Sequence, residues 1–346
     1  MLEGALPYVT RHVLETLIDE GHFTLPLINE SIQRTFNRLR IDKKNRPSEL
    51  IFSGNGTKRQ IKFRMSSAQS WAFFRYLPVS IGEFVPKDSL HWRLMLYLQE
   101  ITDIVLSLNI AESQLDYFDY LYYEFLVLFR RLYPNSSIRP KMHFQLHFRS
   151  IVRRSGPPRT HWSMNFERKN GQVKRPSHTM NNFQNPLFTL SKKIQTVALS
   201  YRLSPFKHDH VDFPFSYQMN VTDYNTIDFS PYLSSPGQSY VTVTSTISFN
   251  GARYRKGDFL LLEREPQGYL FGKIDCILCE DPNEPVFLVN LFSTITFDPH
   301  IYSYCVERKI PSKSRFCTVP NLMDFHALDG LEIAGCIYIR LKYNVC

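Results

Sequence analysis

The chain of 346 residues carries 41 Lys and Arg against 32 Asp and Glu, a formal net charge of +9. Hydrophobic residues make up 43% and aromatic residues 14%, which is typical of a folded protein and excludes a disordered chain. The longest apolar runs, such as 125–129, are too short to cross a bilayer, and no secretory signal is expected at the start. The six scattered cysteines do not form a disulfide framework, so we expect an intracellular protein with reduced thiols.

The charge is strongly segregated along the chain. Residues 130–207 hold sixteen Lys and Arg and one acid, Glu167, and residues 34–64 hold ten Lys and Arg and two acids. Residues 65–129 and 208–346 are both acidic in balance. Such segregation indicates a polyanionic partner. DNA is favoured over acidic lipid because glycine and proline interrupt the larger basic block, and a merely soluble basic surface is the alternative.

The N-terminal half is predicted to be mainly helical. Two short helices are expected over 5–40, and a basic loop or hairpin over 41–64. From Ser67 onward, apolar residues repeat every three or four positions, which predicts helices around 94–108 and 115–132.

The C-terminal part is predicted to be a small barrel of short strands. After a polar linker, β-branched and aromatic residues alternate along the chain, and Asn250-Gly251 signals a turn. The predicted strands are 240–249, 258–262, 269–274, 286–291 and 337–341. Cys276 and Cys279 have a spacing found in zinc sites, but no second pair follows, so two buried strand residues are the preferred interpretation.

The stretch around Glu167 holds the residues most suggestive of chemistry. If it is helical, Trp162, Phe166 and Val173 form an apolar stripe, beside a polar stripe of Glu167, Asn170, Gly171 and Lys174. A lone carboxylate among many cations fits an ion-pair hub or a metal ligand, and the residues alone slightly favour the hub. His143 and His147 lie four apart on one face, as either a metal pair or two hydrogen-bonded histidines.

These motifs resemble a family of DNA transposases. The order Pro140-Lys-Met-His-Phe-Gln-Leu-His147, Gly156-Pro157 and Trp162 to Lys174 resembles the end of the RNase H-like core in CACTA-related and Kyakuja–Dileera–Zisupton-like transposases. Four further stretches are similar to animal members: 2–8, 75–82, 181–193 and 254–274. The resemblance therefore covers nearly the whole chain.

The resemblance implies an α+β fold: a partial RNase H-like core with a long α-helical insertion, followed by a small β-barrel-like C-terminal module. The implied divisions are 1–66 (core remnant with a basic loop), 67–135 (helical insertion), 136–203 (basic end of the core), 204–238 (linker) and 239–346 (all-β module).

In such enzymes three acids hold two Mg²⁺ or Mn²⁺ ions that promote attack on a phosphodiester bond. Glu167 corresponds to the third acid, a catalytic residue and metal ligand, and His143, His147 and Asn170 are candidates for support of the site. The acid expected just before Leu2 has no counterpart, so the chain is expected to be the C-terminal part of a transposase, catalytically incomplete alone and holding no stably bound metal.

The implied partner is DNA in the nucleus, with self-association as a further candidate and no membrane. The residues expected to contact DNA are the cations of the larger basic block: Arg153, Arg154, Arg159, Arg168, Lys169, Lys174, Arg175, Lys192 and Lys193.

The alternative is a non-catalytic chromatin or nucleic-acid module that uses the C-terminal barrel. The stretch Tyr254-Arg-Lys-Gly-Asp258 is weakly similar to chromatin-reader barrels, although Gly257-Asp258 is favoured as a simple hairpin turn. The acidic balance of 208–346 argues against this barrel as the main DNA contact.

Overall fold

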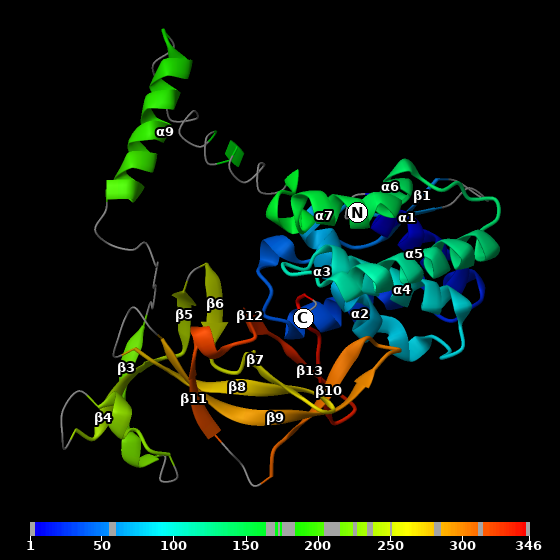
Figure 1. The fold of residues 1–346 in the computed structure, drawn as a ribbon. Coiled ribbons are helices and arrows are strands. Elements are labelled where there is room, and N and C mark those ends of the chain that lie inside the picture. Colours follow the sequence, from blue (N-terminus) through cyan, green and yellow to red (C-terminus); the bar gives the residue numbers. More distant parts are fainter. Residues whose placement is uncertain are drawn as a thin grey trace.

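The structure, a computed structural model, describes residues 4–54, 60–163, 170–171, 174, 184–203, 215–223, 227–233, 238–249, 251–279, 285–310 and 314–343. The protein is a mixed α+β fold, as predicted, with a layer of helices from the N-terminal half packed against a curled sheet from the C-terminal half (Figure 1).

The helical layer is built from the amphipathic segments that the sequence predicts. Its main helices are α1 (Ala5–Asp19), α2 (Leu25–Arg38), α3 (Ser67–Ile81), α4 (Leu90–Val105) and α5 (Glu112–Leu132), followed by the short helices α6 (Pro140–His143) and α7 (Phe148–Ser155). The Ser66 and Gln69 side chains bond to each other's backbone amides and so begin α3 with a capping box. Ser89 caps α4 through the Trp92 amide. The predicted apolar stripes of α4 and α5 lie in the core of this layer.

Between α2 and α3 lies a small antiparallel hairpin of β1 (Ile51–Ser53) and β2 (Gln60–Lys62). Ile61 is buried against α1, whereas its neighbours Gln60 and Lys62 are exposed, as the alternation of a strand requires. The Ile61 amide donates to the Glu15 carboxylate of α1 at 2.6 Å, which fixes the hairpin to that helix.

The C-terminal half forms an antiparallel sheet with a side hairpin. Its strands are β3 (Ser216–Asn220), β4 (Tyr240–Thr244), β5 (Thr246–Phe249), β6 (Ala252–Arg255), β7 (Phe259–Glu265), β8 (Gly268–Leu278), β9 (Val286–Asp298), β10 (Ser303–Arg308), β11 (Ser314–Thr318), β12 (Asp324–Leu328), β13 (Gly330–Ile333) and β14 (Cys336–Ile339). The main path runs β12-β7-β8-β9-β10-β14-β13, with β11 on β9 and β4 on β8.

The order of the strands explains why the sheet curls. The two ends of the main path, β12 and β13, are consecutive in the chain and separated by Asp329 alone. The opposite edges of the sheet must therefore come close together, which gives a half-barrel. Its interior is apolar and includes Phe259, Leu261 and Phe271.

Strand β7 is buried on both faces. Phe259 and Leu261 face the interior of the half-barrel, whereas Leu260 and Leu262 pack under the β5–β6 hairpin. This double burial accounts for the uninterrupted apolar run that predicted a strand here.

The structure changes or adds detail to several expectations for the C-terminal strands. The predicted strand 240–249 is broken at Ser245 into β4 and β5, which belong to different sheets. Gly257, at φ +88°, lies in a turn, but the strands it joins, β6 and β7, pair with other strands and not with each other. Cys276 and Cys279 lie on different apolar clusters on opposite faces of the sheet, so these two thiols do not converge on one ion.

The helices and the sheet share buried polar contacts. The Arg75 guanidinium of α3 donates to the carbonyl oxygens of Leu341 at 3.1 Å and Arg340 at 2.6 Å. The indole of Trp92 in α4 donates to the carbonyl of His300 at 2.9 Å. Leu331 and Tyr343 join the core of the helical layer.

The strand pairings are all antiparallel within the described ranges, and the helical layer contributes only the β1–β2 hairpin. These residues do not confirm an RNase H-like core. The predicted domain boundaries stay a prediction. None of the described helices is long and apolar enough to cross a membrane.

Candidate nucleic-acid interface

The two basic blocks of the sequence meet in an open hollow beside α1. Its volume is about 550 Å³, and four cations line it: Arg11 of α1, Lys62 of β2, and Arg139 and Lys141 at the start of α6. Lys62 comes from the block 34–64, and Arg139 and Lys141 come from the block 130–207. No Asp or Glu lines the hollow, and none of the four cations forms an ion pair with any acid in the described part of the chain.

Local structure explains how these side chains converge. Tyr8 and Arg11 are three residues apart in α1 and therefore share a helix face. Lys62 is the exposed neighbour of the buried Ile61 on β2. Pro140 stands at the first position of α6, where its fixed φ suits a helix start and places Arg139 and Lys141 at the rim.

The Tyr8 ring holds two of the guanidinium groups in place. Arg139 lies 4.7 Å and Arg11 5.5 Å from the ring centroid, so both make cation–π contacts with the same ring. Arg11 also donates to the Gln60 side chain at 3.3 Å, but its buried Nε has no partner among the described residues. A buried donor without a partner favours an acceptor brought by a ligand.

The positive charges of the hollow affect the pKa of His12, which lies one helical turn from Tyr8 in α1. Burial, followed by the positive charges of Arg11 and Arg139, lowers the pKa of His12 to about 4. The two guanidinium groups thus add to the effect of burial in disfavouring a positive charge on His12.

The predicted DNA contacts on α7 and the following turn lie in different surroundings. Arg153 is exposed but forms an ion pair with Glu112, next to Arg149, which pairs with Glu112, Asp116 and Asp119. Arg154 is exposed and has no ion pair with a described acid. Arg159 is half-buried, with its guanidinium 3.5 Å from the centroid of the Tyr343 ring, and so belongs to the junction of helices and sheet.

Lys192 and Lys193 lie on α9 (Pro186–Leu203), whose described side chains are exposed or partly exposed. In Figure 1 this helix stands apart from both the helical layer and the sheet. Lys174 is also exposed. The predicted contacts that the structure describes are therefore distributed over several surfaces, with Arg153 and Arg154 on α7 and Lys192 and Lys193 on α9.

The residues assigned to catalysis are less completely described. Glu167, Arg168, Lys169 and Arg175 lie outside the described residues, and Asn170 is helical and exposed. His143 and His147 are both exposed, with ring centroids 5.5 Å apart. No group of three or more His, Cys, Asp or Glu within the ranges described could hold a metal ion.

Sequence reasoning missed Arg11, Lys62, Arg139 and Lys141 as individual site residues. The signal was present at coarse scale, because both basic blocks had been singled out. What the sequence does not give is the folding of β2 onto α1, which brings Lys62 to the start of α6.

One residue of the stretch that carries the barrel alternative lies in the core. Tyr254 is fully buried, and its hydroxyl donates to the Phe325 carbonyl, so its ring is not available to a ligand.

Comparison of the chain with known protein families, with curated proteins and with solved structures finds no match.

Proposed function

We propose that this protein binds DNA and that it derives from a cut-and-paste transposase. The observation that carries DNA binding is the hollow defined by Arg11, Lys62, Arg139 and Lys141, where residues of both basic blocks meet and no Asp or Glu of the described chain lines the surface. Nuclear location and self-association on DNA belong to the same proposal.

The chemistry of the hollow suits the phosphate backbone. Arg and Lys side chains supply the charge-assisted hydrogen bonds that phosphate oxygens accept. The fixed positions of Arg11 and Arg139 on Tyr8 reduce the conformational entropy lost on binding. Such contacts carry little base specificity, so we expect affinity for duplexes of different sequence. We expect exposed cations outside the hollow, including Arg154, Lys192 and Lys193, to contact further phosphate groups of the same duplex.

The test is the affinity of the full chain for a labelled duplex, measured by fluorescence anisotropy at several salt concentrations. Binding that releases counterions gives a logarithm of affinity that falls linearly with the logarithm of salt concentration, with a slope near −0.9 per phosphate contact. Binding through the hollow alone predicts a slope of about −3 to −4, and the additional cations make it steeper. A flat salt dependence, or no binding at low salt, would refute the proposal.

The transposase origin is supported by the motif order from Pro140 to Lys174 and by the isolated acid Glu167. When bound, Mg²⁺ or Mn²⁺ supplies activation of water or of a 3′-hydroxyl in that family. An extended chain that carries the two upstream acids should nick plasmid DNA with either metal, and Glu167→Gln should abolish nicking while leaving DNA affinity nearly unchanged. Full nicking by the Glu167→Gln variant would remove Glu167 from the catalytic role.

A further inference from the structure

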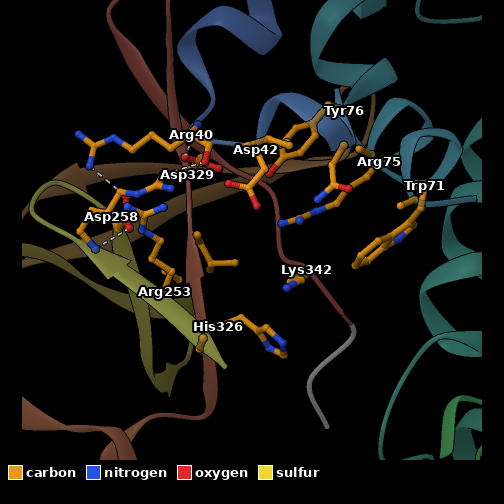
Figure 2. A pocket seen from close by; sticks show the side chains of 18 of the residues that line it. Arg40, Asp42, Trp71, Arg75, Tyr76, Arg253, Asp258, His326, Asp329 and Lys342 are labelled. Atoms are coloured by element: carbon orange, nitrogen blue, oxygen red, sulfur yellow. Dashed lines mark hydrogen bonds and ion pairs between the residues drawn. The ribbon is translucent and has the colours of Figure 1, made fainter. Parts of the chain in front are cut away.

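A second cavity lies where the helical layer meets the sheet. Its volume is about 350 Å³, within the range of small-molecule sites. Segments far apart in sequence line it: the residues after α2, one face of α3, the β6 and β12 strands and the C-terminal segment around Lys342 (Figure 2).

The charges are divided between the two ends of this cavity. At one end, Asp258 pairs with Arg40 at 3.1 Å, and Asp329 accepts the backbone amide of Arg40 at 3.0 Å, with Asp42 nearby (Figure 2). At the other end, Lys342 lies between Trp71 and His326 (Figure 2). The acid nearest in sequence to His326, Asp324, is already bonded to that ring at 2.6 Å.

Lys342 is a half-buried cation that forms no ion pair with any acid in the described ranges. Its Nζ lies 5.6 Å from the centroid of the Tyr343 ring and 6.0 Å from that of Trp71. The acid whose charge stabilises it is Asp324, which is bonded to His326. Burial, followed by the positive charges of Arg75 and Arg159, lowers the pKa of Lys342 to about 8. An anion in the cavity would offset both effects.

Arg253 of β6 also lines the cavity and forms no ion pair with a described acid, but it lies on the side of Asp258, at the end opposite Lys342 (Figure 2). Trp71 supplies an aromatic wall, held by its stack on Tyr343 with centroids 5.4 Å apart and planes at 18°. Asn45 adds an amide that can donate and accept hydrogen bonds.

We propose that this cavity binds a nucleotide, with Lys342 contacting the phosphate group and Trp71 lining the position of the base. The cavity is too large for inorganic phosphate alone, and its aromatic wall fits a flat ring. The nucleotide is either free or the phosphorylated end of a DNA strand. The inference does not depend on the hollow beside α1, so it stands or fails separately from the proposed DNA binding.

The test is isothermal titration calorimetry of the full chain with thymidine 5′-monophosphate, adenosine 5′-monophosphate, thymidine and inorganic phosphate. We expect a monophosphate to bind more tightly than thymidine or inorganic phosphate. Lys342→Met keeps the length and apolar stem of the side chain and should weaken binding about tenfold or more, since it removes a charge-assisted contact. Arg253→Gln, at the opposite end of the cavity, should weaken binding less than Lys342→Met does, and the exposed Lys87→Met is the matched control that should leave binding unchanged.

Oligonucleotides distinguish the two sources. Single strands with and without a 5′-phosphate are compared for binding to the wild type and to Lys342→Met. If only the phosphorylated strand binds in a Lys342-dependent way, the ligand is a strand end; if mononucleotides bind at least as well, it is a free nucleotide. Absence of binding by every phosphate compound, or binding that Lys342→Met and Arg253→Gln leave unchanged while both variants melt as the wild type does, would overturn the proposal.

Discussion

The carboxylate of Asp103 in α4 and the guanidinium of Arg340, just after β14, lie 2.5 Å apart, and both side chains are at least nine-tenths buried. This pair joins the helical layer to the sheet across 237 positions of sequence. The Tyr302 ring lies 4.5 Å from the guanidinium and adds a cation–π contact. The junction is thus held by buried charges as well as by apolar packing.

The first prediction concerns this pair. Asp103→Ala leaves a buried guanidinium without its partner and should lower the free energy of unfolding by about 3–5 kcal/mol. Joint replacement by Asp103→Leu and Arg340→Met removes both charges and should restore much of that loss. Urea unfolding of the full chain measures both, with the exposed i,i+4 pair Glu30–Arg34 as a control whose loss should cost well under 1 kcal/mol. A double variant no more stable than Asp103→Ala would contradict this account.

The second prediction concerns the curl of the sheet at Gly272. A Cβ atom at this position would lie 2.7 Å from Cγ2 and 2.9 Å from Cβ of Val289, so a side chain cannot enter without displacing β9. Gly272→Val should lower the free energy of unfolding by about 1–3 kcal/mol. Gly251, at φ +77° with nothing within 4 Å of a built Cβ, is the control, because Asn adopts that conformation readily. Equal melting temperatures for Gly272→Val and Gly251→Asn would show that β8 and β9 are less tightly packed.

The third prediction is a pH effect at His12. Its pKa of about 4 in the folded protein lies below the value of 6.5 for an unfolded chain, so the unfolded state binds the proton more tightly. The stability contributed by this residue is present above pH 6.5 and is lost as the pH falls from 6.5 toward 4. His12→Phe should flatten the pH dependence of the free energy of unfolding in that window. An unchanged slope would remove His12 as its source.

The fourth prediction links His12 to the ligand. Phosphate groups placed beside Arg11 and Arg139 would offset the charges that lower the pKa of His12, so DNA binding should raise this pKa. Titration of the imidazole by NMR, with and without a short duplex, measures the change. Because His326 lines the second cavity, the duplex carries no 5′-phosphate, and His326, which is bonded to Asp324 away from the hollow, then serves as the internal control. A His12 pKa that does not move at saturating DNA would place the duplex elsewhere.

The sequence predicted much of the local structure because that structure depends on local patterns. The apolar periodicity located α4 and α5, two short helices were expected over the range of α1 and α2, and apolar and β-branched runs located the core of β7, β8 and β9. The strand β12 was not predicted, because its pairing with the distant strand β7, and not its composition, makes it a strand. The short strand β13, which pairs with the neighbouring β14, was not predicted either.

From the sequence, the site was predicted only as two basic segments and not as individual residues. The charge counts identified both basic blocks, yet the convergence of Lys62 with Arg139 depends on the tertiary contact between β2 and α1. Likewise, nothing local marks Lys342 as a half-buried cation without an ion pair in the described ranges, because its surroundings come from α3, β6 and β12.

The most direct test of the central claim compares two charge-matched double variants in DNA binding. Arg139→Gln with Lys141→Gln removes two cations from the hollow, and Lys192→Gln with Lys193→Gln removes two from α9. We predict that the hollow variant weakens binding more and reduces the slope of the salt dependence by about two contacts, with an unchanged melting temperature. Wild-type affinity and salt slope in the hollow variant, with the loss confined to the α9 variant, would contradict the claim that DNA binds where the two basic blocks meet.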